Sequence, residues 1–290
     1  MTVRADPSAW RRRRARPWVI GHRGASAEVT ENTTDAFDAA VRAGADGIEF
    51  DVQLCRDGEL VVFHDRDLSR LVGRGEAIAD LSLAAVRAIR LDQGRRIPTL
   101  DQVFEHFAAS DALLNVEIKS GGLRRAGRSA DAVLACLARH RPTLLPRVLI
   151  SSFDPLAVLR VRRTAGHVLT GQLFHSKQLR PFRRAWAVRL LRPSAVHPSQ
   201  GLVTSSTFAD WKRRGLLVNT WTVDRPARQR ALAALGVDAL ITNDPAACLA
   251  TLSAPDRAHA SDSDNDNMDD GSGTGRRSIS PGSNLVKPPA

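Results

Sequence analysis

Short apolar runs and amphipathic stretches alternate along most of the chain. Runs of about four to eight residues rich in Val, Ile and Leu are typical of buried strands, whereas apolar residues spaced three and four apart indicate helices. The apolar runs predict strands at Trp18–Gly21, Gly47–Leu54, Leu113–Ile118, Arg147–Ser151, Leu169–Phe174, Ser194–His197, Leu217–Val223 and Ala239–Thr242. The amphipathic stretches predict helices near residues 34–43, 99–109, 127–139, 154–164, 178–191, 205–214, 226–235 and 245–252.

This alternation predicts the fold class. Eight strand–helix units in about 235 residues fit an α/β fold, a single (β/α)8 barrel of the TIM type. A doubly wound open sheet is the alternative that the same pattern allows. One further β segment, Glu59–His64, is expected to form a small excursion after the second strand. In such barrels the functional side chains stand at the C-terminal ends of the strands, so candidate chemistry is sought there.

The two ends of the chain differ in composition from the predicted barrel, residues 18–252. Residues 1–17 are expected to form a disordered basic leader, and residues 253–290, rich in Ser, Asp, Asn, Gly and Pro, a disordered tail. No apolar run approaches the roughly 20 residues of a membrane-spanning helix. The apolar residues that follow the N-terminal arginines are too few for a signal peptide. We therefore expect a cytoplasmic protein.

Composition and charge narrow the class of partner. The chain has 290 residues, 43% hydrophobic and 25% charged, which is enough to bury a core. Its formal net charge of +11 attracts phosphate-rich partners such as nucleic acid, anionic lipid or a phosphoryl substrate. Because the arginines are scattered, we expect no specific nucleic-acid partner and do not favour a peripheral membrane contact. The three cysteines lie far apart and fit a reducing compartment better than a disulfide framework or a zinc site.

The first predicted strand ends in the turn Gly21-His22-Arg23-Gly24. His22 can exchange a proton near neutral pH, and the Arg23 guanidinium offers a rigid set of donors that matches a phosphate. The two glycines allow the backbone to approach a ligand closely. The same residues also fit an ordinary strand-end turn with a surface arginine, so their interpretation depends on what the neighbouring strands add.

Carboxylates and a lysine follow on the next two barrel strands. Glu49 and Asp51 alternate with apolar residues and therefore share one face of their strand, about 7 Å apart. A divalent cation between them would remove their repulsion, and oxygen ligands select Mg²⁺ or Ca²⁺ rather than Zn²⁺. Glu117 and Lys119 share a face of the next strand. They suit one more cation ligand and one phosphate contact, or else an ion pair that adds little stability.

Two further segments complete a consistent set of side chains. His64 and Asp65 follow an apolar run, where a solvated histidine would be unusual, although a buried core histidine fits as well. Trp221 could form a wall of the pocket against the carbon skeleton of a polyol, or pack as an ordinary barrel residue. Three carboxylates, two histidines, one Arg and one Lys at strand ends are suited to cleaving a phosphodiester.

These residues give the chain a resemblance to a known family, the glycerophosphodiester phosphodiesterases, which share a phospholipase-C-like barrel. The similarity runs in order from about residue 18 to residue 250. It rests on His22-Arg23-Gly24-Ala25-Ser26, Glu31-Asn32-Thr33, Gly44-Ala45-Asp46-Gly47-Ile48-Glu49-Phe50-Asp51-Val52-Gln53-Leu54, Val61-Val62-Phe63-His64-Asp65, Ile97-Pro98-Thr99-Leu100, Glu117-Ile118-Lys119, Ser151-Ser152-Phe153-Asp154, Trp221-Thr222-Val223-Asp224 and Gly236-Val237-Asp238-Ala239-Leu240-Ile241-Thr242-Asn243-Asp244-Pro245.

The resemblance implies hydrolysis of a small-molecule glycerophosphodiester to an alcohol and sn-glycerol 3-phosphate, with one divalent cation, Mg²⁺ or Ca²⁺. It assigns roles to particular side chains. The cation would be held by Glu49, Asp51 and Glu117; the acid–base pair would be His22 and His64; the phosphate would be bound by Arg23 and Lys119; and the glycerol pocket would be bordered by Phe153 and Trp221.

The chain departs from the family pattern at three positions. Thr30 stands where Pro is usual, Cys55 where Thr or Ser is common, and Asp224 where Asn is frequent. None of the three is an implied ligand, so these departures concern the shape of loops more than the chemistry.

Several alternatives remain open at the level of sequence. The attacking group is water or the 2-hydroxyl of glycerol, and either histidine can be the acid. A lysophospholipase D-like or a phosphatidylinositol phospholipase C-like activity on lipids is the alternative function. It would need a docking surface for the membrane, for which residues 180–192, with Arg mixed among Phe, Trp and Leu, are the candidate. The same residues also fit a barrel helix with one buried face, and the pattern leaves the oligomeric state open.

Overall fold

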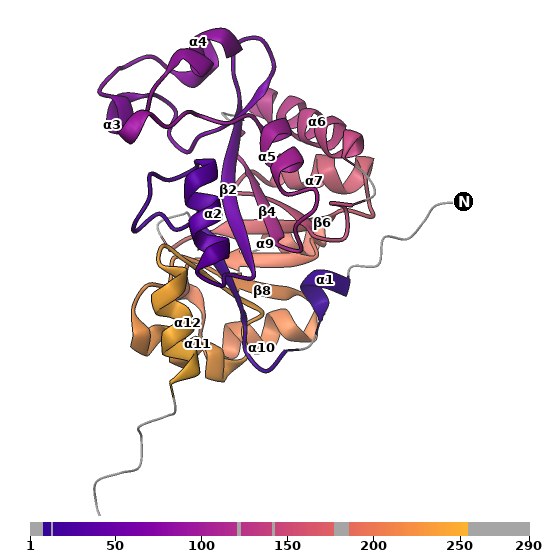
Figure 1. Cartoon of the computed structure of the whole chain (residues 1–290). Coiled ribbons are helices and arrows are strands. Elements are labelled where there is room, and N and C mark those ends of the chain that lie inside the picture. The colour runs from indigo at the N-terminus through magenta and orange to yellow at the C-terminus, as the bar shows by residue number, and fades with distance from the viewer. Residues whose placement is uncertain (1–7, 13, 121–122, 141–142, 177–185, 255–290) are drawn as a thin grey trace, which may run out of the picture. The chain divides into compact units, whose positions relative to one another are not determined.

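Eight parallel strands close into a barrel in the computed structural model of the chain (Figure 1). Each strand pairs with the next in the order β1, β2, β4, β5, β6, β7, β8, β9, and β9 pairs again with β1. The short strand β3 is antiparallel to β2 and lies outside this ring. The bounds are β1 Trp18–His22, β2 Gly47–Leu54, β3 Leu60–Val62, β4 Leu113–Ile118, β5 Val148–Ser152, β6 Leu169–Phe174, β7 Ala195–Pro198, β8 Leu217–Thr220 and β9 Ala239–Thr242. The barrel prediction is confirmed, and the open sheet is excluded.

The structure describes residues 8–12, 14–120, 123–140, 143–176 and 186–254. Chain contacts divide the protein into two units, Met1–Ala254 and Pro255–Ala290, and the barrel belongs to the first. The predicted tail, residues 253–290, lies from residue 255 onward outside the described residues.

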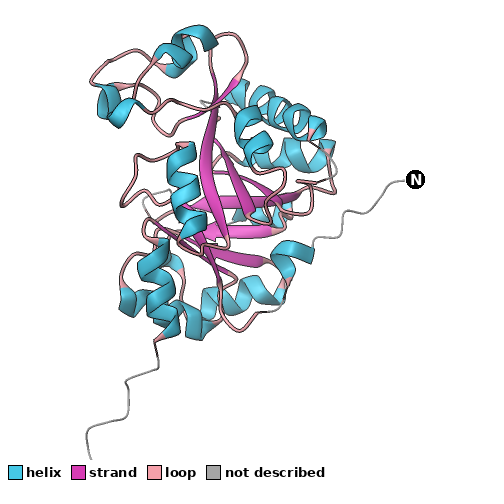
Figure 2. Cartoon of the chain, viewed as in Figure 1, coloured by secondary structure: helices cyan, strands magenta, loops and turns pink. Residues whose placement is uncertain are grey.

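The helices after the barrel strands are shown in Figure 2. Side-chain caps begin several of them: Thr33, Thr99, Asp154, Thr204 and Asp244 each accept a bond from a backbone N–H of the first turn. Of the predicted helix at 178–191, residues 178–185 lie outside the described residues and the rest contain α9. The bounds are α2 Thr34–Arg42, α5 Leu100–His106, α6 Leu123–Arg139, α7 Pro155–Thr164, α9 Trp186–Leu191, α10 Ser205–Arg213, α11 Pro226–Leu235 and α12 Pro245–Ser253.

The predicted excursion is larger than its one β segment suggested. After β3 the chain forms short helical turns, α3 Ser69–Val72, η1 Ile78–Asp80, α4 Leu83–Ala88 and η2 Asp92–Gly94, before α5. Elements of three to six residues are too short to show helical periodicity, so the sequence pattern missed them. A small apolar core that includes Phe63, Leu68 and Ile78 holds the excursion together. This core fixes the start of the loop that carries His64.

The expectation of a disordered leader is wrong for the part of it that the structure describes. Ser8–Arg11 form a helical turn, α1, whose Trp10 side chain is only 2% exposed. The Trp10 indole Nε1 donates to the Arg147 carbonyl oxygen at 2.8 Å, and Trp10 packs with apolar residues inside the barrel, among them Leu113 and Leu217. Leu113 and Leu217 are the first residues of β4 and β8, so Trp10 closes the N-terminal mouth of the barrel. Trp10 anchors this segment to the barrel, and Arg14 and Arg16 add ion pairs to Asp46.

Within the described residues, no helix is long and apolar enough to cross a membrane.

Candidate active site

The turn after β1 places His22 and Arg23 at the C-terminal mouth of the barrel. Arg23 adopts a φ of 57° and Gly24 a φ of 87°, so the chain reverses sharply at the strand end. A Cβ on Gly24 would lie 2.5 Å from the Ala36 carbonyl group, which only glycine avoids. The Arg23 backbone N–H donates to the Glu49 carbonyl oxygen at 2.8 Å. The turn is thereby fixed against β2, which carries the first carboxylates.

The strand register brings three carboxylates together. Glu49 on β2 lies beside His22 on β1, and Asp51 on β2 lies beside Glu117 on β4. All three carboxylates are buried, at 3%, 1% and 6% exposure for Glu49, Asp51 and Glu117. One oxygen from each lies within 4.8 Å of the others. Carboxylate oxygens gathered this closely suit a hard divalent cation.

The pKa values of the three carboxyl groups shift in different directions. Burial, together with the adjacent Asp51 and Glu117, raises the pKa of Glu49 well above its usual range. Burial also raises the pKa of Glu117. Burial alone would raise the pKa of Asp51 too, but Lys119 and Arg23 hold it below its usual range. Glu49 Oε1 is buried without a hydrogen-bond partner. An unpartnered oxygen beside two other carboxylates is the place where a cation fits.

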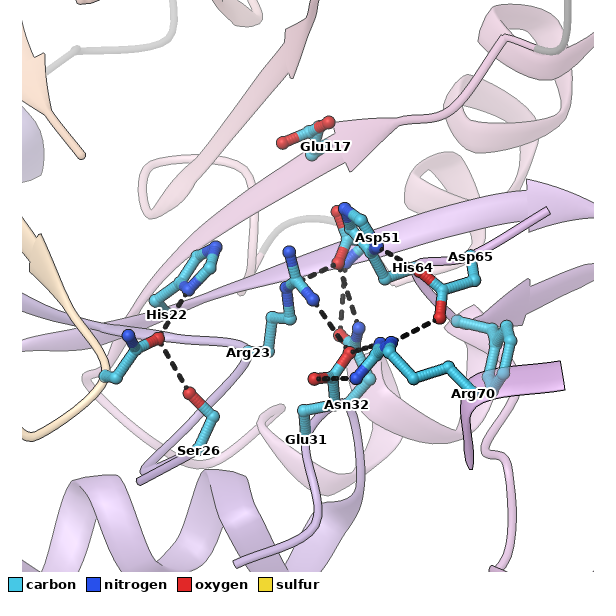
Figure 3. A network of polar contacts seen from close by, with 12 residues as sticks. His22, Arg23, Ser26, Glu31, Asn32, Asp51, His64, Asp65, Arg70 and Glu117 are labelled. Atoms are coloured by element: carbon cyan, nitrogen blue, oxygen red, sulfur yellow. Dashed lines mark hydrogen bonds and ion pairs between the residues drawn. The ribbon is translucent and has the colours of Figure 1, made fainter. Parts of the chain in front are cut away.

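Two cationic side chains lie against the carboxylates. The Lys119 ammonium contacts Asp51 Oδ1 at 2.9 Å and pairs with Glu117. The Arg23 guanidinium lies 3.3 Å from Asp51 Oδ2 and donates to Glu31 Oε1 at 2.8 Å (Figure 3). Both side chains therefore point into the same mouth, where they could also reach an anionic ligand.

The two histidines reach the site with different partners. His22 Nδ1 bonds Asn243 Oδ1 at 2.7 Å, while His64 Nδ1 bonds Asp65 Oδ1 at 2.7 Å (Figure 3). Burial and the neighbouring Arg23 lower the pKa of His22 to about 4. Burial also lowers the pKa of His64, but the Asp51 and Asp65 carboxylates oppose that shift. One imidazole therefore has an amide partner and the other a carboxylate.

Ion pairs behind Asp65 hold His64 in place. Arg70 Nε donates to Asp65 Oδ2 at 2.6 Å, and the Arg70 guanidinium also bonds both oxygens of Glu31. Glu31 in turn holds Arg23. The loop of the excursion and the turn after β1 are thereby tied together by ion pairs around the mouth.

Phe153 and Trp221 are the two aromatic residues that the sequence pointed to. Their rings meet edge to face, with centroids 5.5 Å apart, and both are half-buried. Lys119 Nζ lies 5.9 Å from the Phe153 ring centroid, which places this aromatic pair beside the charged residues. On another side of the site, His64 and Lys119 line a cavity of about 500 Å³ together with Arg66 and Arg125.

The structure thus brings the implied carboxylates, histidines, cations and aromatic residues to one mouth. It also adds residues to which sequence analysis gave no role. Asn32 donates to Asp51 Oδ2 at 2.9 Å. Arg70 donates to Asp65, the partner of His64, and Asn243 bonds His22 itself. Asn32 and Asn243 stood within the family motifs and could have been singled out. Arg70 lies in the excursion, where no strand pattern points to it.

Comparison with known proteins gives a consistent result. A sequence model of the glycerophosphoryl diester phosphodiesterase family matches residues 22–247. The chain is 35% identical over 236 residues to the glycerophosphodiester phosphodiesterase of Caldanaerobacter subterraneus subsp. tengcongensis, covering 78% of this chain and 94% of that protein.

Solved structures agree with the sequence comparison. The glycerophosphodiester phosphodiesterase of Thermotoga maritima superposes with a TM-score of 0.67 at 30% identity, over 81% of this chain and 97% of the other. A phosphodiesterase of Oleispira antarctica, solved in complex with its product sn-glycerol-3-phosphate, superposes with a TM-score of 0.74 at 26% identity, over 82% and 98% of the two chains.

Proposed function

The chain belongs to the glycerophosphoryl diester phosphodiesterase family and is an enzyme that hydrolyses glycerophosphodiesters; we propose that it does so with one bound divalent cation and the pair His22 and His64. One observation carries this proposal. Glu49, Asp51 and Glu117 meet at the same mouth as the two histidines. The products are an alcohol and sn-glycerol 3-phosphate, the molecule that the Oleispira antarctica relative binds.

The three carboxylates are the proposed ligands of the cation. Their burial, their mutual repulsion and the unpartnered Glu49 Oε1 all fit a bound Mg²⁺ or Ca²⁺. When bound, such an ion supplies Lewis-acid stabilisation to a phosphoryl oxygen. Arg23 and Lys119 add positive charge on the same side, so they bind and orient the phosphate.

The partners of the two histidines divide the proton-transfer roles. Burial and the neighbouring Arg23 lower the pKa of His22 and favour its neutral form, so Nε2 accepts a proton from the attacking hydroxyl while Nδ1 bonds the Asn243 amide oxygen. His64 donates Nδ1–H to the Asp65 carboxylate, which stabilises the protonated ring, so its Nε2 gives a proton to the leaving alkoxide. The cavity beside His64 would then receive the leaving alcohol, and Phe153 with Trp221 would border the glycerol.

The other expectations on partners and place in the cell remain proposals. A cytoplasmic location agrees with three free, buried cysteines. We propose a soluble small-molecule substrate rather than a lipid in a membrane or a nucleic acid. Much of the candidate membrane segment, residues 180–185, lies outside the described residues.

A release assay tests the proposal. The enzyme is incubated with glycerophosphocholine, glycerophosphoethanolamine, glycerophosphoinositol and lysophospholipids, with and without EDTA. The sn-glycerol 3-phosphate released from the diesters, the lysophosphatidate released from the lysophospholipids and the head-group alcohol released from either are measured. We expect release from the water-soluble diesters that EDTA abolishes and Mg²⁺ or Ca²⁺ restores. Turnover that EDTA leaves unchanged would contradict the cation, and a preference for lysophospholipids would favour the lipid-directed alternative. Detection of a cyclic phosphate by ³¹P NMR would identify the glycerol 2-hydroxyl as the attacking group.

A further inference from the structure

A chain of hydrogen bonds leads from His22 to a carboxylate outside the reaction site. Asn243 follows β9, and its side-chain Oδ1 lies 2.7 Å from His22 Nδ1. On the other side of the same amide, Nδ2 donates to Asp224 Oδ2 at 2.7 Å. Asp224 itself contacts neither the three carboxylates nor the two histidines through a hydrogen bond among the described residues.

The chemistry of Asp224 decides which way the Asn243 amide faces. An ionised carboxylate only accepts hydrogen bonds, so the amide must present its NH₂ group to Asp224 and its oxygen to His22. The Ser26 hydroxyl donates to the same Asn243 oxygen at 2.9 Å, which agrees with that orientation. The backbone holds the residue as well, since the Asn243 N–H donates to Asp224 Oδ1 at 2.9 Å.

The orientation of the amide in turn decides the tautomer of His22. The Asn243 oxygen can only accept, so His22 Nδ1 must carry the proton. The neutral ring then has its lone pair on Nε2, which faces Glu49 Oε2 at 4.0 Å and therefore points into the mouth. A general base needs that arrangement, because it must have a free nitrogen where the proton is to be taken.

We infer that Asp224 is a positioning residue, which fixes the orientation of the Asn243 amide and through it the Nδ1–H tautomer of His22. The inference rests on the proposed role of His22 as the base. The inference depends on the residue at position 224 being an aspartate. An asparagine there could face Asn243 with either a donor or an acceptor, and the direction of the chain of bonds would no longer be fixed.

The central variant is Asp224→Asn, which keeps the shape of the side chain but removes its negative charge and its acceptor-only character. Loss of a residue that orients a catalytic or metal-binding imidazole typically costs about 10–100-fold in activity. We expect kcat to fall by about 10-fold with KM nearly unchanged, because Asp224 touches no substrate. In ¹⁵N spectra of the histidines at pH 7.5, His22 should show a protonated Nδ1 in the wild type and a mixture of tautomers in the variant.

Two further variants separate positioning from a simple structural defect. The exchange Asp224→Asn with Asn243→Asp restores a donor-to-acceptor pair and again places an acceptor against His22 Nδ1, so the tautomer should return. Asp244→Asn makes the same chemical change one residue from Asn243, at the cap of α12, where its side chain accepts from the Ala247 N–H. This control should keep both the tautomer and kcat.

The outcomes separate this inference from the proposed function. If the His22 tautomer is the same in the wild type and in Asp224→Asn, the inference is overturned, whatever happens to turnover. If the tautomer changes but kcat does not, Asp224 keeps its positioning role and His22 is not the catalytic base. If the wild type releases no sn-glycerol 3-phosphate, the proposed function fails, while the tautomer measurement still decides the role of Asp224.

Discussion

The two mouths of the barrel are built from opposite kinds of side chain. At the N-terminal mouth, Trp10 packs on apolar residues such as Leu113 and Leu217, and its indole N–H has a backbone partner. At the C-terminal mouth, buried carboxylates face one another, and one oxygen of Glu49 has no partner. Apolar packing stabilises the fold, whereas buried like charges destabilise it unless a ligand compensates them. Stability and function are therefore expected to respond to substitutions at opposite ends.

The largest expected effect is on turnover, at the charged mouth. His22→Ala and His64→Ala should each lower kcat by about 10²–10⁴-fold, the usual contribution of one acid or base. The midpoint of thermal unfolding should stay close to that of the wild type, because both imidazoles lie at the rim of the core. Release of sn-glycerol 3-phosphate measures kcat, and His106→Ala, on the exposed side of α5, is the matched control. Wild-type turnover in either variant would exclude that histidine from the pair.

The opposite mouth should show the reverse pattern. Trp10→Ala removes a buried side chain from the end of the barrel and should lower the free energy of unfolding by about 3–5 kcal/mol. Turnover of the folded enzyme should stay within about twofold of the wild type. Urea unfolding measures the loss, and Trp10→Phe, which keeps most of the apolar area but loses the bond to Arg147, should lose less. A loss below about 1 kcal/mol for Trp10→Ala would mean that α1 does not close the barrel.

A carboxylate substitution sharpens the contrast between function and stability. Glu49→Gln should weaken Mg²⁺ or Ca²⁺ binding by at least about 10–100-fold, as a ligand should matter no less than a residue that orients one. Without the cation, the variant should be as stable as the wild type or more so, because one of three buried carboxylates becomes neutral. Calorimetric titration gives the affinity, and Glu105→Gln on the surface of α5 is the control. Unchanged affinity would remove Glu49 from the cation site.

The sequence predicted the residues at the C-terminal mouth, where the carboxylates lie, better than those at the N-terminal mouth, where Trp10 packs. Alternating apolar residues fixed β2 and β4, so Glu49, Asp51 and Glu117 had to share the inner face of neighbouring strands. A single tryptophan among arginines forms no repeating pattern of apolar residues, so residues 1–17, which include Trp10, were predicted to be disordered. Burial of one large side chain against distant strands depends on tertiary contacts that local composition does not encode.

Contacts around the active site that join distant parts of the chain were also not predictable from the local sequence. Asp65 and His64 are neighbours in sequence, so the contact between them is local. Arg70 reaches Asp65 from a short helix of the excursion, and Asn243 reaches His22 across 221 residues of chain. The strand pattern shows which side chains enter the mouth, but the contacts between loops depend on how those loops pack. The hydrogen-bond partners that give the two histidines different chemical environments were therefore visible only in the structure.

Between the two mouths lies a histidine that should link pH to stability. His197 on β7 is fully buried, its Nε2 bonds the Asn219 amide at 3.1 Å, and Gly171 leaves room for its ring. Burial lowers the pKa of His197 to about 3. The unfolded chain binds a proton at a pKa of about 6.5, so below that pH the unfolded state binds more protons than the folded one. Stability should therefore fall as the pH falls from about 6.5 towards 3, by about 2 kcal/mol between pH 7 and pH 5.

The variant His197→Gln keeps a polar side chain and removes the ionisable group. Its free energy of unfolding should fall by about 2 kcal/mol less than that of the wild type over the same pH interval, whatever its absolute stability at pH 7. Urea unfolding at pH 7 and pH 5 in EDTA measures the difference without a cation at the carboxylates. His106→Gln removes an exposed imidazole and serves as the comparison. Because His197 belongs to neither mouth, the substitution separates the acid sensitivity of the barrel interior from that of the catalytic histidines. If the free energy of unfolding falls equally in wild type and variant between pH 7 and pH 5, the acid sensitivity lies at the charged mouth instead.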